Sequence, residues 1–175
     1  MKMKIGIDID DVIRDFVGKL KEIYFREYPS HKLIKEDVWN MSLWFPIEKE
    51  IYKFAFETYA KEIYIQARTY ENALEFLIKL RKNNRVILVT KQPSKKLEGL
   101  TKEWLEIKNI PYDGLIFTQD KSEFAGDYLL DDSTANLERI KQVKRSIPIC
   151  FDRPWNQDWK GQRVKSYNEF LELIK

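Results

Sequence analysis

The residues with the clearest chemical potential are two aspartates near the N-terminus, Asp8 and Asp10. They close an apolar run, residues 3–9, that is typical of a strand buried on both faces of a parallel sheet. Side chains alternate along a strand, so both carboxylates are expected on one side, with Cα atoms about 6 to 7 Å apart. Carboxylates this close raise a pKa or require a cation between them. The alternative is that both aspartates only end a strand and begin a turn.

A second acidic pair, Asp131 and Asp132, follows the apolar residues 128–130. In an open parallel sheet the carboxyl ends of the strands face one crevice, where ligands bind. The two acidic pairs are therefore predicted to converge on one metal ion, although they lie far apart in the chain. The alternative is that Asp132 or Ser133 caps the next helix.

The supply of ligand atoms limits which metal the chain can hold. It has one cysteine, Cys150, and one histidine, His31, so it can assemble no Cys/His zinc set and no internal disulfide. Any metal must be held mostly by oxygen, and Mg²⁺ takes few carboxylates while keeping several waters. We expect Mg²⁺ as the cofactor.

Two further residues could bind an anion. Thr90 ends the apolar run 85–90, and a hydroxyl group at that place can donate a hydrogen bond, although threonine is also an ordinary strand residue. Lys121 lies in the run TQDKSEFAGD ahead of the second acidic pair. Taken alone, a lysine in so charged a chain is a solvated surface residue.

Alternating strands and helices must position these residues. Apolar runs predict strands over 85–90, 114–118, 127–130 and 147–151, and helical periodicity predicts helices over 70–82, 96–108, 135–143 and 167–174. This alternation predicts an α/β fold with a parallel sheet flanked by helices. Between the first strand and residue 70 the chain is rich in aromatics and shows no strand pattern. We expect a catalytic core over residues 1–17 and 67–175, with a small all-helical cap over residues 18–66.

The aromatics of the cap offer faces on which a flat group could stack. Our candidates are Phe16, Trp39, Trp44 and Phe45. The competing interpretation, that each simply fills the core of the cap, is favoured for every one of them except Phe16.

Composition excludes several classes of protein. The 175 residues carry a formal charge of +3, too small a surplus for a dedicated nucleic-acid binder. The six glycines fit neither the dinucleotide fingerprint nor the P-loop. The N-terminal run is interrupted by aspartates and shows no membrane-spanning or signal pattern. We therefore expect a cytoplasmic protein without a membrane partner.

The order of these motifs resembles the haloacid dehalogenase (HAD) superfamily of phosphohydrolases, which have a Rossmann-like core. That order is Asp-x-Asp-x-Val, a helical insertion, a strand ending in Thr, and a Lys ahead of a strand ending in Asp-Asp. The runs IDIDDVIRDF, TQDKSEFAGDYLLDDS and FDRPWN further resemble the 5'(3')-deoxyribonucleotidases of the cytosolic type C group. Asp11 departs from the usual glycine, Lys91-Gln92-Pro93 from the usual Ser-Pro after the threonine, and Gln119 from a frequent arginine.

The resemblance implies a role for each motif residue. Asp8 would be the nucleophile that forms an aspartyl-phosphate, and Asp10 the general acid and base. Thr90 and Lys121 would hold the phosphoryl oxygens. Mg²⁺ would be bound by Asp8, the main-chain carbonyl of Asp10 and Asp131, with Asp132 acting through water. The resemblance places Phe16 and Lys91 near the substrate. We expect Trp39, Trp44 and Phe45 to contact it as well, on the separate ground that they are aromatics of the cap.

The function that these features favour is an Mg²⁺-dependent phosphomonoesterase acting on nucleoside (deoxy)monophosphates. The alternatives are a phosphatase of sugar or other small phosphate esters, and a catalytically silent binding protein or a phosphatase partner of nucleic-acid repair. The expected partner is a small phosphate ester, and a homodimer is compatible with the sequence.

Overall fold

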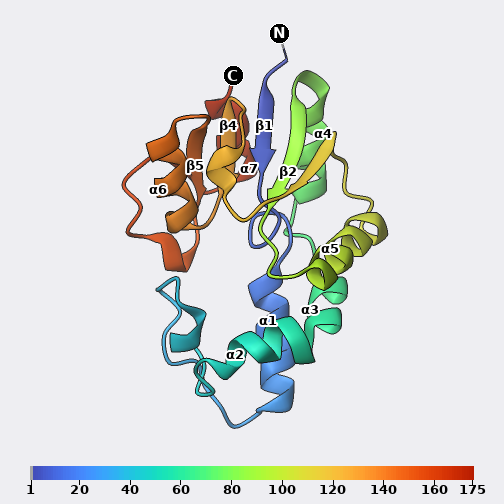
Figure 1. The fold of residues 1–175 in the computed structure, drawn as a ribbon, viewed down its shortest axis with the longest axis vertical. Coiled ribbons are helices and arrows are strands. Elements are labelled where there is room, and N and C mark those ends of the chain that lie inside the picture. Colours follow the sequence, from blue (N-terminus) through green and yellow to red (C-terminus); the bar gives the residue numbers. More distant parts are fainter. Residues whose placement is uncertain (1) are drawn as a thin grey trace.

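A six-stranded parallel sheet forms the centre of the protein, seen in a computed structural model that describes residues 2–175 (Figure 1). The strand order is β3-β2-β1-β4-β5-β6, and all neighbouring strands pair in parallel. The strands are β1 (Lys4–Ile7), β2 (Arg85–Thr90), β3 (Gly114–Phe117), β4 (Tyr128–Asp131), β5 (Ile147–Phe151) and β6 (Arg163–Val164). The predicted α/β class and parallel sheet are confirmed, and β6, only two residues long, is an addition that the sequence did not indicate.

Helices cover both faces of the sheet because alternate strand residues point in opposite directions. The helices of the core are α4 (Ala73–Asn83), α5 (Lys95–Ile107), α6 (Thr134–Val143) and α7 (Tyr167–Leu173). Val86 and Leu88 of β2 belong to the large core cluster with α4, α5 and α7. Their neighbours Ile87 and Val89 pack instead with Ile140 of α6. The sheet is therefore buried on both faces, which explains why its strands read as continuous apolar runs.

Residues 16–66 form helices joined by turns and irregular stretches, and they contain no strand. They comprise α1 (Phe16–Glu27), α2 (Glu50–Lys53), a π-helical turn (Phe54–Thr58), α3 (Ala60–Gln66) and a short 3₁₀ turn over Met41–Leu43. Figure 1 shows this segment beyond the end of the sheet at which β1 ends. The segment has its own apolar cluster. Three residues from other parts of the chain, Leu97, Leu100 and Trp155, also belong to this cluster. The first helix begins at Phe16, two residues before the expected boundary of the cap, because Asp15 caps it by accepting from the Gly18 amide.

Two glycines provide a test of how tightly this fold is packed. A Cβ at Gly126, just before β4, would lie 2.6 Å from the Lys4 carbonyl oxygen and 2.5 Å from the Phe124 ring. A Cβ at Gly99 within α5 would meet nothing within 4 Å. We expect Gly126→Ala to lower the free energy of unfolding by about 1 to 3 kcal/mol through overpacking. Gly99→Ala should raise it by about 0.4 to 1 kcal/mol.

Urea unfolding of the two variants beside the wild type measures both changes. Equal stabilities for the two variants would contradict the close approach of β1 to the loop before β4.

Candidate active site

Three carboxylates converge where β1 and β4 end. The two strands are neighbours in register, with Ile7 beside Leu130, so Asp8 and Asp131 emerge next to each other. One carboxylate oxygen from each of Asp8, Asp131 and Asp132 lies within 4.8 Å of the others. All three side chains are buried. Asp8 and the second acidic pair thus meet at one end of the sheet, as the parallel topology predicts.

Lys121 lies between two of these carboxylates. Its Nζ is 2.6 Å from Asp8 Oδ2 and 2.7 Å from Asp131 Oδ2. The side chain is buried, so it is not a solvated surface lysine. Burial opposes its charge, but Asp131 and Asp8 outweigh that effect and raise the pKa of the ammonium group above its ordinary value. Lys121 therefore remains a cation within the site.

One ammonium group leaves the three buried carboxylates with excess negative charge. Burial and the nearby charges of Asp131 and Asp132 raise the pKa of Asp8 well above its ordinary value, against the opposing effect of Lys121. Burial, Asp11 and Asp131 raise the pKa of Asp132 in the same way. A divalent cation bound by these oxygens would offset the repulsion, and oxygen-only donors suit a hard cation. The residues present therefore fit a divalent metal.

Neighbouring groups orient the second acidic pair. Asp131 Oδ1 accepts from the Ser133 amide at 2.8 Å, and Asp132 Oδ2 accepts from the Trp155 indole at 2.9 Å. The side chain of Asn156 donates to the Asp132 carbonyl at 2.9 Å. Ser133 is the residue that caps α6, so Asp132 is not used as a helix cap. The FDRPWN run thus contributes two side chains that hold Asp132.

Asp10 lies in the same cavity as Asp8 but outside the three-carboxylate cluster. Its Oδ1 accepts from Arg14 Nε at 2.7 Å, and its Oδ2 accepts from Gln92 Nε2 at 2.9 Å. The next residue, Asp11, has a φ of 55°, a left-handed conformation that Asp tolerates better than most residues. Burial raises the pKa of Asp11 to about 7, although hydrogen bonds from the Val17 amide and the Tyr70 hydroxyl act in the opposite direction.

A cavity of about 400 Å³ joins these polar groups to an aromatic wall. Thr90 is buried and Lys91 exposed, and both line it. Of the four candidate aromatics, Phe16, Trp39 and Trp44 also line it. Phe45 is not at its wall, because it is fully buried in the helical segment with its ring 4.6 Å from that of Tyr24. The placement of Phe45 beside a substrate is therefore not supported by the geometry.

Sequence reasoning missed several residues of this cavity. Phe56 stacks on Phe16 at 5.9 Å and on Tyr52 at 6.4 Å, with nearly parallel rings in both pairs. Trp155 contacts Trp44 at 5.3 Å, which joins the helical segment to the group that holds Asp132. The aromatic density of the segment signalled such a wall, but only the folded chain distinguishes the rings that face the cavity from those that fill the core.

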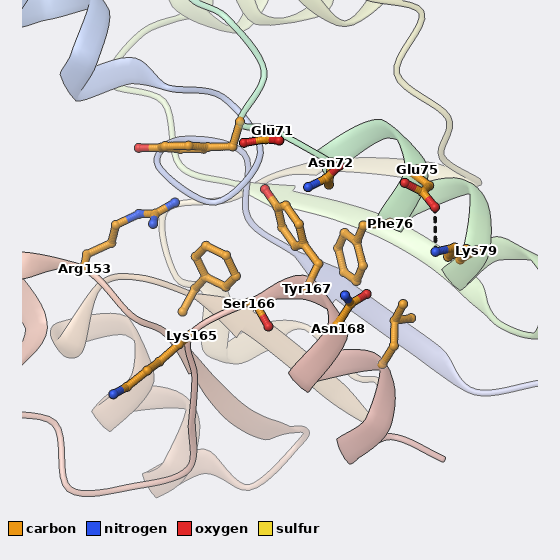
Figure 2. Close-up of a pocket in the computed structure, with 13 residues that line it drawn as sticks. Glu71, Asn72, Glu75, Phe76, Lys79, Arg153, Lys165, Ser166, Tyr167 and Asn168 are labelled. Carbon is orange, nitrogen blue, oxygen red and sulfur yellow. Dashed lines mark ion pairs between the residues drawn. The ribbon is translucent and has the colours of Figure 1, made fainter.

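A second cavity, also about 400 Å³, contains none of the predicted site residues (Figure 2). Figure 2 shows Arg153 beside aromatic rings, and its guanidinium centre is 4.1 Å from the ring centre of Tyr70. Arg153 Nε donates to the Asp11 carbonyl at 2.7 Å, and the Tyr70 hydroxyl donates to Asp11 Oδ1 at 3.1 Å. This cavity therefore borders the turn at Asp11 and holds no acidic cluster of its own.

Solved structures with a similar fold include HAD-like hydrolases. A haloacid dehalogenase-like hydrolase of Streptococcus pneumoniae matches with a TM-score of 0.68 and 13% identity over 99% of each chain. The HAD-hydrolase YfnB of Bacillus subtilis, solved with magnesium, matches with a TM-score of 0.64 and 11% identity over 99% of each chain. The chain therefore has the fold of HAD-like hydrolases, with its acidic cluster where β1 and β4 end.

Within that class, residues 2–175 match the model of the family described as 5' nucleotidase, deoxy (pyrimidine), cytosolic type C protein, and the chain belongs to this family. A protein of Chlorobaculum tepidum assigned as a 5'(3')-deoxyribonucleotidase is 25% identical over 98% of this chain and 89% of its own. A protein of Halalkalibacterium halodurans assigned as a nucleotidase is 26% identical over 97% and 89%. The protein is a phosphoric monoester hydrolase, which sets aside a silent binding protein. None of the helices described is long and apolar enough to cross a membrane.

The acidic cluster predicts that a divalent cation stabilises the fold. Millimolar Mg²⁺ should raise the melting temperature above that in NaCl of equal ionic strength, because the ion binds the folded chain and relieves repulsion among buried carboxylates. Asp131→Asn, which removes one carboxylate from the cluster, should lose most of this rise. Asp37→Asn, at an exposed acid, should keep it. Thermal melts of the three proteins decide the matter, and an equal rise in all three would show that the cluster is not where the ion binds.

Proposed function

We propose that the protein is an Mg²⁺-dependent phosphatase of nucleoside (deoxy)monophosphates that works through an aspartyl-phosphate on Asp8. The observation that carries this proposal is a single cavity with Asp8, Asp10, Thr90 and Lys121 in one part and stacked aromatic rings in another. A phosphate ester with a flat group matches both parts. Membership of the nucleotidase family supports the same substrate class.

The residues that would hold Mg²⁺ are Asp8, Asp131 and the main-chain carbonyl of Asp10, with Asp132 acting through water. When bound, the ion supplies positive charge to the phosphoryl oxygens and offsets the excess of buried carboxylates.

In the first step, a carboxylate oxygen of Asp8 attacks phosphorus and the bond to the leaving oxygen breaks. Lys121 favours the ionised form of Asp8 that this attack requires, since its ammonium group lies 2.6 Å from Oδ2. Lys121 and Thr90 hold the transferring oxygens with hydrogen-bond donors already in place. Asp10 gives its proton to the leaving alcohol.

In the second step, water attacks phosphorus and releases phosphate from Asp8. Asp10, now a carboxylate, takes the proton of that water, so it acts as acid and then as base. The bond between phosphorus and Asp8 breaks, which restores the free nucleophile. Two displacements at one phosphorus replace a single, more difficult one.

The aromatic wall supports a nucleobase as the flat group. Phe16, Phe56 and Tyr52 form a row of nearly parallel rings on this wall. Stacking of one base on an aromatic ring contributes about 1 to 3 kcal/mol. Lys91 at the exposed part of the cavity is a cation that could contact the sugar or the phosphate.

The covalent mechanism predicts that Asp8→Asn is inactive. The amide keeps the shape of the side chain but lacks the nucleophilic charge, so phosphate release should fall by about a thousand-fold or more. Asp158→Asn, the same change at an exposed aspartate, should retain the wild-type rate. Steady-state assays with a nucleoside monophosphate and Mg²⁺ measure both rates. Retained activity in Asp8→Asn would exclude Asp8 as the nucleophile.

The nucleobase assignment predicts different effects for two phenylalanines of the helical segment. Phe56→Ala removes a ring from the cavity wall and should lower kcat/KM for a nucleoside monophosphate by about 5- to 150-fold, the equivalent of one lost stack. It should change kcat/KM for a sugar phosphate much less. Phe45→Ala, which truncates a core ring, should lower the melting temperature and affect both substrates alike.

The measurement is kcat/KM for both substrates, with melting temperatures, in the wild type and the two variants. If Phe56→Ala lowers kcat/KM for both substrates by the same factor, the enzyme is better described as a phosphatase of sugar or other small phosphate esters.

A further inference from the structure

Arg14 is a buried arginine directly beside the acid and base of the proposed reaction. It is fully buried, and its Nε donates to Asp10 Oδ1 at 2.7 Å. Its Nη2 donates to Thr101 Oγ1 at 3.2 Å. The guanidinium centre lies 4.6 Å from the ring centre of Tyr64 and 5.0 Å from that of Trp104. The guanidinium group thus packs against two aromatic rings, and its Nε is bound to Asp10.

Stability alone does not account for this arginine. Its third nitrogen, Nη1, is buried and has no hydrogen-bond partner among the described residues. Burying a cation with an unsatisfied donor is costly, and well-packed apolar residues often stabilise such a place at least as well. Arg153 Nη2 is likewise buried without such a partner among the described residues, so the feature that distinguishes Arg14 is its bond to the Asp10 carboxylate.

Gln92 holds the other oxygen of the same carboxylate. Its Nε2 donates to Asp10 Oδ2 at 2.9 Å, and its Oε1 accepts from the Tyr64 hydroxyl at 2.8 Å. The Asp10 carboxylate fixes which way the amide points, because the reversed amide would bring its oxygen against a carboxylate oxygen, and the Tyr64 hydroxyl donates to the amide oxygen on the other side. Gln92 also belongs to the run Lys91-Gln92-Pro93, which follows Thr90 where the family usually has Ser-Pro.

The two donors use one lone pair on each oxygen of Asp10. A carboxylate oxygen has two acceptor sites, so one on each oxygen remains for a proton. The Asp10 side chain is 26% exposed and lines the cavity that contains Asp8. The carboxylate is therefore fixed from behind while its free positions remain accessible from the cavity.

We propose that Arg14, together with Gln92, is a positioning residue that holds the Asp10 carboxylate in the orientation in which it exchanges protons with the leaving alcohol and the attacking water. The inference rests on the proposed role of Asp10. General acid catalysis contributes about 10²- to 10⁴-fold, and it depends on hydrogen-bond geometry. Loss of orientation should therefore slow reactions whose leaving group needs a proton.

The test compares two substrates that differ in this need. A nucleoside monophosphate releases an alcohol that must be protonated, whereas nitrophenyl phosphate releases a stable anion. In Arg14→Met, kcat/KM for the nucleotide should fall about 10-fold or more beyond the fall for nitrophenyl phosphate. Arg14→Lys, which restores the charge without the fixed Nε donor, should recover part of this difference.

Arg153→Met is the matched control. Arg153 also stacks on aromatic rings, and it binds the carbonyl of Asp11 rather than the Asp10 carboxylate (Figure 2). Arg153→Met should lower kcat/KM for both substrates by the same factor. The backbone bonds that close the loop, from the Asp11 amide to the Arg14 carbonyl at 2.8 Å and from the Arg14 amide to the Ile9 carbonyl at 2.9 Å, do not involve the side chain of Arg14.

A double-mutant cycle shows whether Arg14 acts through Asp10. In an Asp10→Asn background, Arg14→Met should cause no additional loss that depends on the leaving group. An equal additional loss in both backgrounds would overturn the proposal. If Arg14→Met does not fold, as judged by its melting curve, Gln92→Leu and Thr101→Val undergo the same two-substrate comparison, and an unchanged ratio in both would overturn it too.

The outcomes separate this inference from the proposed function. If the wild type hydrolyses neither ester, or Asp8→Asn stays active, the proposed function fails. If the wild type hydrolyses both and the Arg14 variants slow both alike, only the positioning role of Arg14 fails.

Discussion

The interaction on which the rest of the site depends is the burial of three carboxylates around one ammonium group. Asp8 and Asp132 have pKa values raised above 3.8, so their protonated forms contribute to stability at low pH. That contribution is lost as the pH rises through the raised values, because the ionised carboxylates are then buried away from water and repel each other. A divalent cation can take the place of those protons near neutral pH. The acidic cluster therefore links metal affinity, nucleophile ionisation and fold stability in one set of charges.

The topology of the sheet creates this cluster. Because β1 and β4 are parallel neighbours, residues separated by more than 120 positions end at the same edge. The amide of Ser133, at the start of α6, binds Asp131, and the loop after β5 supplies the indole of Trp155 and the amide of Asn156. The start of α6 and the loop after β5 thus each contribute a donor to a carboxylate, and Asn156 also binds the main-chain carbonyl of Asp132. This distribution compensates part of the cost of burying so many acids.

Site residues could be predicted from the sequence where they lie at the end of a regular strand. Asp8, Thr90 and Asp131 each lie at the end of a buried apolar run, and such runs are read directly from composition. The short strand β6 carried no such pattern. Arg14 and Gln92 were missed because their importance arises from contacts with Asp10. Gln92 is 82 positions from Asp10 in the chain, so its contact is visible only in the folded structure.

The aromatics of the helical segment could be predicted as a group and not individually. The chain forms a π-helical turn there, in which the Tyr59 amide donates to the Phe54 carbonyl at 2.9 Å. Such a turn adds one residue to the helical repeat and shifts the faces that follow it, which periodicity of 3.6 residues does not anticipate. Phe56 lies within the turn and lines the cavity. Phe45 lies before α2 in a stretch without helix and is buried, so helical periodicity predicts neither placement.

The position of Trp155 gives the protein an internal optical reporter. Its indole N–H donates to Asp132, and its ring contacts Trp44 of the helical segment. Among the described residues, it is the tryptophan whose N–H is bound to a carboxylate, since those of Trp44, Trp104 and Trp159 donate to main-chain carbonyls. Indole emission depends on nearby charge and on contact with a second indole. The emission of Trp155 should therefore respond both to the ionic state of the acidic cluster and to the placement of the helical segment.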